Sequence, residues 1–137
     1  DPVETWTVVG TGTYTYQLYW SSDGNGTPYV EAGHEVYQSS TRPDSYKITN
    51  WGGDVDLEFT WNKDDNTCNV PAQEVGVTLS DYGTMYVGEQ SDYFGEGDSS
   101  YYDPATSTFT FSLVYFVEAG YFTNTVGTET LQVTWNE

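Results

Sequence analysis

The chain has 137 residues, and 21 acidic residues against three basic ones give it a formal net charge of −18. This charge repels phosphate groups, and three basic residues cannot form a basic stripe, so nucleic acids and anionic membrane surfaces are poor partners and we expect no nucleic acid to bind. A chain of this length buries about two-thirds of its unfolded surface. We therefore expect residues 1–137 to fold as a single domain that needs neither disulfides nor a structural metal.

The residue usage favours strands over helices. Thirteen Tyr, five Trp and six Phe accompany a single Met, and aromatic residues are enriched in strands. No apolar run reaches the ~18 residues of a membrane span, so we expect none. Cys68 is the only cysteine, which by count rules out an internal disulfide and a Cys/His metal site. We expect Cys68 to act as a small buried hydrophobic residue.

The first half of the chain alternates apolar and polar residues in short runs, which is the period of a pleated strand. Gly10 and Gly12 predict the end of the first strand, and Asp23–Gly26 and Trp51–Asp54 predict turns. In chain order the runs are Trp6–Val9, Thr13–Trp20, Tyr29–Gln38, Ser45–Asn50, Val55–Trp61 and Thr67–Ala72. The last two of these runs predict a hairpin.

The strongest strand signal of the second half lies at Thr108–Val117. One parity of this run is apolar throughout, and the other parity also turns apolar at Val114 and Phe116. A strand covered on both faces needs neighbours on both edges, so we predict a central strand. The other predicted strands of this half are Val75–Leu79, Thr84–Val87 and Glu129–Trp135.

The spacing of these runs predicts an all-β fold. About nine to eleven short strands recur every 8–12 residues, which is typical of an antiparallel β-sandwich or a barrel. We predict a β-sandwich first and a closed or partly open β-barrel second.

The sequence offers no catalytic residue, metal ligand or cofactor site that its pattern singles out. His34 is the only histidine, and no Gly-x-Ser-x-Gly motif accompanies it. We expect His34 to lie on a strand surface or to be buried with its polar atoms satisfied. Ser21–Gly26 resembles the middle of a calcium loop, but Ser21 and Ala32 stand where acidic ligands are required, which favours an ordinary turn. The 21 acids offer too many pairings to identify a hydrolytic pair.

Aromatic residues outside the strand pattern are the candidate ligand-binding residues. The irregular stretch from Gly88 to Pro104 is long for a compact domain, and such segments are often functional. Sugar rings stack on exposed aromatic side chains, with polar neighbours contacting the hydroxyl groups. The alternative is a loop that folds back and buries its own aromatic residues. The candidates are Trp51, Tyr82, Tyr93, Phe94, Tyr101 and Tyr102.

Several short sequence phrases follow one another across nearly the whole chain. They are Trp6, Gly10–Thr15, Val36–Gln38, Arg42–Trp51, Phe59–Asn62, Val70–Gly76 and Phe109–Phe111. In this order they resemble the small secreted or surface-anchored lipoprotein domains of Bacteroidetes. The resemblance implies export, a β-rich fold and residence at the cell surface, often in bacteria that handle polysaccharides. It supplies no functional residue, and we expect any export signal or lipid anchor to lie upstream of Asp1.

These observations lead to three functional hypotheses. The first is a non-catalytic extracellular binding module for a polysaccharide or oligosaccharide. The second is a structural or protein-interaction domain that contacts another surface protein, and the third is a small hydrolase with paired carboxylates. Exposure of Trp51, Tyr93 or Tyr101 in a shallow groove would favour sugar binding. Two acids facing each other across a cleft would favour the enzyme.

Overall fold

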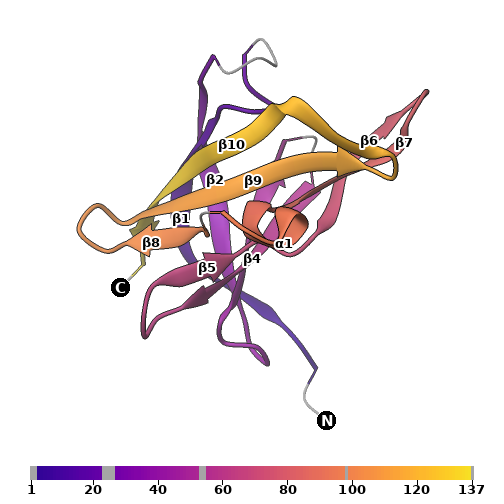
Figure 1. Ribbon diagram of the computed structural model, residues 1–137. Helices are drawn as coiled ribbons and strands as arrows, with labels where there is room; N and C mark the ends of the chain where they lie inside the picture. Colours follow the sequence, from indigo (N-terminus) through magenta and orange to yellow (C-terminus); the bar gives the residue numbers. More distant parts are fainter. Residues whose placement is uncertain (1–2, 23–26, 53–54, 98, 137) are drawn as a thin grey trace.

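A computed structural model describes residues 3–22, 27–52, 55–97 and 99–136 (Figure 1). It is all-β, as predicted, with ten strands and one short helix in the described part of the chain. The predicted turn at Asp23–Gly26 and residues 53–54 of the next turn lie outside the described residues. The elements are β1 Trp6–Tyr16, β2 Tyr29–Ser39, β3 Ser45–Trp51, β4 Val55–Asn62, β5 Thr67–Asn69, β6 Gln73–Leu79, β7 Gly83–Glu89, α1 Gln90–Phe94, β8 Tyr101–Asp103, β9 Thr108–Val117 and β10 Gly120–Trp135.

The ten strands form one antiparallel sheet that curls back on itself. The strand order is β10-β1-β2-β3-β4-β5-β8-β9-β7-β6, and β9 also pairs with β10. Two layers of the curled sheet therefore enclose the core in a sandwich-like arrangement, while the β9–β10 pairing joins them along one side. The β6–β7 hairpin continues beyond this junction, so the sheet is not a regular barrel; in Figure 1 the hairpin projects to the right.

β9 is the central strand, as its alternation predicts. One edge pairs with β10 over most of its length, and the other edge pairs first with β8 and then with β7. Residues of its apolar parity, such as Phe109, Phe111 and Tyr115, are fully buried. On its second face Val114 is also buried, whereas Phe116 is only half-buried.

Two glycines that were expected to end the first strand instead lie inside it. β1 runs unbroken through Gly10 and Gly12 and pairs with β10. A Cβ atom at Gly10 would lie 2.7 Å from the Thr134 carbonyl oxygen, and one at Gly12 would lie 2.5 Å from the Leu131 side chain. The glycines therefore permit close approach of the two strands, a role that glycine also has in strand interiors.

The core is built largely from aromatic rings. Phe59 packs against Phe109 and Phe111 with ring centroids 5.0 Å apart in each case, and Trp51 stacks on Tyr115 at 6.1 Å. Cys68 is buried, as expected. No helix in the described residues is long and apolar enough to cross a membrane.

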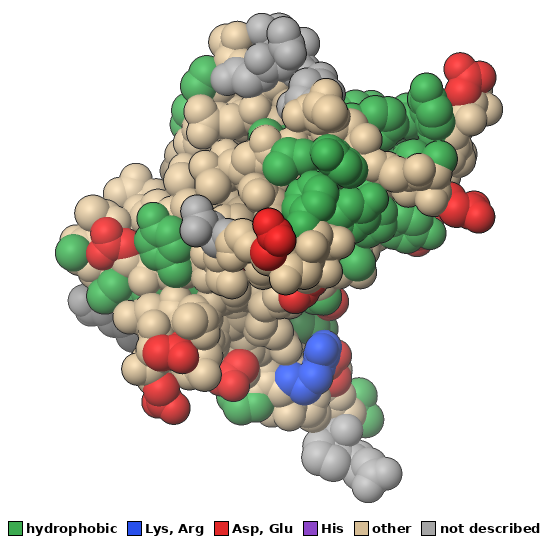
Figure 2. All heavy atoms as spheres, in the orientation of Figure 1, with side chains coloured by type: hydrophobic (Ala, Val, Ile, Leu, Met, Phe, Trp, Pro, Cys, Tyr) green, Lys and Arg blue, Asp and Glu red, His purple; other side chains and the backbone are tan. Residues whose placement is uncertain are grey.

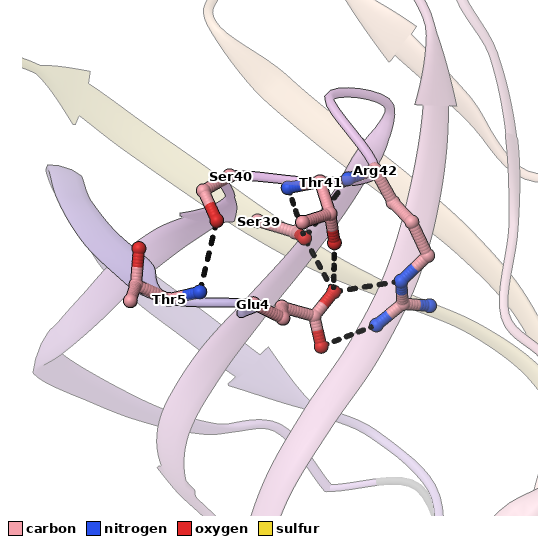
Figure 3. A network of polar contacts seen from close by, with 6 residues as sticks. All are labelled: Glu4, Thr5, Ser39, Ser40, Thr41 and Arg42. Atoms are coloured by element: carbon pink, nitrogen blue, oxygen red, sulfur yellow. Dashed lines mark hydrogen bonds and ion pairs between the residues drawn. The ribbon is translucent and has the colours of Figure 1, made fainter. Parts of the chain in front are cut away.

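A polar network fixes the segment that precedes β1 to the turn between β2 and β3 (Figure 3). The Glu4 carboxylate accepts two hydrogen bonds from Arg42, at 2.8 Å from Nε and 3.1 Å from Nη2. The hydroxyls of Ser39 and Thr41 donate to the same carboxylate. The hydrogen bonds from Arg42, followed by that from Ser39, lower the pKa of Glu4 to about 2.

Candidate functional site

Five aromatic side chains from four elements gather on the face of the molecule that carries α1. Tyr93 is in contact with Phe116 at a ring-centroid distance of 4.8 Å and with Phe94 at 5.0 Å, and Phe94 lies 5.0 Å from Tyr121. Tyr86 stacks on Phe116 at 5.6 Å. Figure 2 shows hydrophobic side chains gathered over this region. We call Tyr86, Tyr93, Phe94, Phe116 and Tyr121 the aromatic surface.

Sheet register explains why three of these rings meet. Tyr86 of β7 and Tyr121 of β10 are both direct cross-strand partners of Phe116 of β9. Directly paired residues point to the same side of a sheet, so the three side chains form one row. The core-facing neighbours of Phe116 are Tyr115 and Val117, so the row faces away from the core.

α1 supplies the other two rings. The helix directly follows β7 and ends at Gly95, whose φ of 75° is the left-handed conformation that favours glycine at a helix end. Tyr93 is therefore held against Phe116 of β9, and Phe94 against Tyr121 of β10. Tyr93 keeps 37% of its surface exposed, and Tyr121 keeps 45%.

A pocket of about 300 Å³ opens beside Tyr93 and Phe116. A Cβ atom at Gly88 would lie 3.4 Å from the Phe116 ring and 3.5 Å from Ala72, so the absence of a side chain at this position keeps the pocket open. We call it the Tyr93 pocket. Its lining residues are Ala72, Gly88, Glu89, Asp92, Tyr93 and Phe116.

Glu89 is a buried carboxylate at the inner side of the Tyr93 pocket, only 1% exposed. It accepts hydrogen bonds from the backbone N–H groups of Val70 (3.0 Å) and Ser100 (2.7 Å) and from the Ser100 hydroxyl (2.8 Å). Burial raises the pKa of Glu89, these hydrogen bonds partly oppose the shift, and the charge of Asp92 adds to it. Because Ser100 Oγ also accepts from the Ser112 N–H, Glu89 ties β9 to the segments beside β5 and β8.

Asp92 is the exposed carboxylate of the same pocket. Its Oδ2 atom accepts a 2.7 Å hydrogen bond from the side-chain amide of Asn69 on β5. Asp92 thus places a carboxylate in the same pocket as the Tyr93 ring, and Asn69 is its hydrogen-bonded neighbour on β5. This pairing of an exposed ring with polar groups can contact both the C–H face and the hydroxyls of a sugar.

A second pocket lies on the other side of Tyr121. Its volume is about 210 Å³, and its lining includes Tyr82, Tyr121 and Phe122. Tyr82 contacts Phe122 edge to face at 5.6 Å. Since Tyr121 also contacts Tyr93, this pocket adjoins the aromatic surface.

The structure brings together only part of the set that the sequence singled out. Tyr93 and Phe94 lie in the aromatic surface, and Tyr82 lines the adjoining pocket. Tyr101 is 51% exposed on β8 but lines neither pocket.

The prediction that Trp51 and Tyr102 are exposed ligand-binding residues was wrong, because both side chains are buried. Trp51 is fully buried because it ends β3 with its side chain inside the sheet, stacked on Tyr115. Tyr102 points inward, as its position next to the outward-facing Tyr101 requires, and its hydroxyl accepts a hydrogen bond from Trp135.

Sequence reasoning missed Tyr86, Phe116 and Tyr121 as site residues, along with both carboxylates of the pocket. The apolar second face of β9 was a signal for Phe116, but it predicted burial rather than a partly open site. For Glu89 and Asp92 no pattern in the sequence separated them from the other acids.

A third pocket, of about 260 Å³, lies at a different place on the sheet. Trp61 stacks on Trp135 in it at 5.5 Å, and the Lys63 ammonium lies 5.2 Å from the Trp61 ring centroid. We call it the tryptophan pocket. Its lining residues are Val9, Gln38, Tyr46, Trp61, Lys63, Trp135 and Asn136.

His34 is buried, with both ring nitrogens beside oxygen atoms. Nδ1 lies 2.7 Å from the Thr49 carbonyl oxygen, and Nε2 lies 3.0 Å from Glu31 Oε1. Among the described residues no group of three or more His, Cys, Asp or Glu side chains could hold a metal ion. Residues 23–26 of the calcium-like turn lie outside that part of the chain.

A comparison of the chain with protein-family models gave no match, and curated proteins and solved structures gave none of significance either. The features that bear on function are therefore the geometry of the Tyr93 pocket and of the aromatic surface.

Proposed function

We propose that the protein is a non-catalytic binding module whose aromatic surface binds carbohydrate. The observation that carries the proposal is the Tyr93 pocket, where two aromatic rings line the same cavity as Asp92, whose carboxylate is hydrogen-bonded to Asn69. The C–H groups of a sugar pack on aromatic rings, and its hydroxyls exchange hydrogen bonds with carboxylates and amides. The extracellular, cell-surface location implied by the sequence resemblance is part of the same proposal.

The ring geometry favours a short glycan segment over a flat polysaccharide surface. Tyr93 and Phe94 meet at 88°, Phe94 and Tyr121 at 88°, and Tyr93 and Tyr121 at 77°. Rings at right angles form corners rather than one flat platform. A corner suits a single sugar unit that contacts one ring with its face and another with its edge.

Protein interaction is the second candidate function, and the position of β6 favours it. β6 is the last strand of the sheet order and pairs only with β7 in the described part of the chain, so its outer edge is open. An open edge can add a strand from a partner, with nearby apolar side chains giving specificity. In this function the aromatic surface would contact a protein side chain instead of a sugar.

Thermal shift with neutral oligosaccharides tests the proposal. A ligand at a hundred times its dissociation constant stabilises the folded state by about 2.7 kcal/mol, on the order of 8 °C for a domain of this size. We expect a shift that Tyr93→Ala reduces, with affinity falling more than about fivefold. Tyr101→Ala is the matched control, because Tyr101 is an exposed tyrosine outside both pockets.

The proposal fails if no glycan shifts the melting temperature, or if Tyr101→Ala weakens binding as much as Tyr93→Ala. Binding of a protein partner that is lost in Tyr93→Ala, with no response to any glycan, would favour the second function.

A further inference from the structure

The basic residues of the chain all lie away from the Tyr93 pocket. The chain contains three, and each has a partner elsewhere. Arg42 pairs with Glu4, Lys47 lies 3.5 Å from Asp56, and Lys63 lies over the rings of the tryptophan pocket. None of them lines the Tyr93 pocket, whose two ionisable carboxyl groups are those of Glu89 and Asp92. On the face shown in Figure 2, the basic side chains lie near the N-terminal end, away from the aromatic surface.

The aromatic rings of the pocket, like its carboxyl groups, attract positive charge. The face of an aromatic ring carries negative electrostatic potential and attracts a cation within about 6 Å of its centroid. Tyr93, which is 37% exposed, lines the pocket together with Asp92, in a molecule with a formal charge of −18. Phe116 stacks on Tyr86 and lies against Tyr93, so it adds apolar lining to the pocket. A neutral sugar gains nothing from this potential, and an acidic sugar is repelled by it.

From this arrangement we infer that the Tyr93 pocket recognises an amino sugar, with the ammonium group between Asp92 and the Tyr93 ring. The inference rests on the proposed carbohydrate-binding function and names its ligand class. At about 300 Å³ the pocket is at the small end of ligand-binding cavities, which suits one sugar unit of a chain. Glu89 has its oxygens engaged by Val70 and Ser100, so Asp92 is the carboxylate that meets the ligand.

Calorimetric titration with three oligosaccharides of equal length tests the inference. Oligomers of glucose, N-acetylglucosamine and glucosamine differ at one ring position, and a mildly acidic buffer keeps the amines charged. We expect the glucosamine oligomer to bind about tenfold more tightly than the other two. This preference should shrink as salt is added, because exposed charges are screened.

Two variants with the same charge change separate a local contact from general attraction to an acidic protein. Asp92→Asn should remove most of the preference for glucosamine, whereas any loss of contact with sugar hydroxyls should weaken the three oligomers alike. Asp64→Asn is the control, because Asp64 lies exposed in the turn between β4 and β5. Gly88→Val should fill the pocket and weaken the binding of all three oligomers, because even a Cβ atom at this position contacts Phe116.

The outcomes distinguish the inference from the function on which it rests. Equal affinity for the three oligomers overturns the inference and leaves carbohydrate binding intact. Equal loss of preference in Asp92→Asn and Asp64→Asn also overturns it, because the attraction would then be non-specific. If none of the oligomers binds, the proposed function itself fails.

Discussion

The aromatic surface and the tryptophan pocket are built from similar side chains, but they differ in whether basic and polar groups of the protein already contact their rings. In the tryptophan pocket, Lys63 lies over Trp61, and the indole N–H groups of Trp61 and Trp135 donate to Asn66 and Tyr102. In the aromatic surface no basic residue lies over a ring, as the three basic residues are all elsewhere. The polar groups of the tryptophan pocket therefore find their partners within the protein, whereas Tyr93, Phe94 and Tyr121 of the aromatic surface stay exposed with no basic residue over them.

This difference shows that aromatic content alone does not identify a binding site. A half-buried tryptophan stabilises the fold when its N–H donates a hydrogen bond and a lysine ammonium lies over its ring. A half-exposed tyrosine beside a carboxylate can instead use its ring to contact a ligand. The contrast predicts that substitutions in the tryptophan pocket affect stability, and that substitutions in the aromatic surface affect binding.

The largest expected effect is the loss of stability in Trp61→Ala. Trp61 contacts Tyr102, Phe109 and Trp135, so its removal leaves a void in the sheet and should cost about 3 kcal/mol of unfolding free energy. Tyr93→Ala, at a more exposed position, should cost about 1 kcal/mol or less. Urea unfolding of both variants measures the difference, and equal losses would contradict the contrast between the two regions.

A lysine added to the aromatic surface should make it resemble the tryptophan pocket. In Asn69→Lys the new ammonium can reach Asp92, which Asn69 already contacts, and cover the Tyr93 pocket. We expect ligand affinity to fall about tenfold, or ~1.4 kcal/mol, with little change in stability. Asn69→Gln keeps the amide without the charge and is the control. Unchanged binding in Asn69→Lys would show that the pocket is not the ligand site.

The limits of sequence reasoning follow from the same two regions. The alternation in β9 was enough to predict a central strand, because a strand's period is visible in a single segment. The row of Tyr86, Phe116 and Tyr121 was not visible, because it depends on the register of three strands that are far apart in sequence. Trp51 next to Gly52 suggested an exposed turn, although the side chain of the last residue of a strand can still point into the core.

The sequence also could not assign environments to individual carboxylates. Glu4 and Glu89 have the same ordinary pKa of 4.5, yet the structure shifts them in opposite directions. Glu4 meets Arg42, which lowers its pKa to about 2. Glu89 has no basic partner and is buried, which raises its pKa. These opposite shifts give Glu4 and Glu89 opposite effects on the dependence of stability on pH.

The smallest expected effects concern pH and can be resolved by comparing unfolding curves. The contribution of Glu4 is fully present above pH 4.5 and is lost as the pH falls toward 2, because the unfolded state then takes up the proton first. Arg42→Gln lacks the pairing, so the stability gap between the wild type and Arg42→Gln should close over this range. A gap that stays constant would show that the Glu4–Arg42 pair does not set the pKa of Glu4.

Glu89 acts in the opposite sense. Because its pKa in the folded state is raised above 4.5, the folded protein holds the proton longer than the unfolded chain, and stability falls as pH rises from 4.5 through the raised value. Glu89→Gln cannot ionise, so its unfolding free energy should fall less over that interval, whatever constant offset its altered hydrogen bonds cause. Glu129, also buried with a raised pKa, is present in both proteins and cancels in the comparison. Parallel curves for Glu89→Gln and the wild type would mean that Glu89 keeps an ordinary pKa, and that the Tyr93 pocket is more hydrated than its burial indicates.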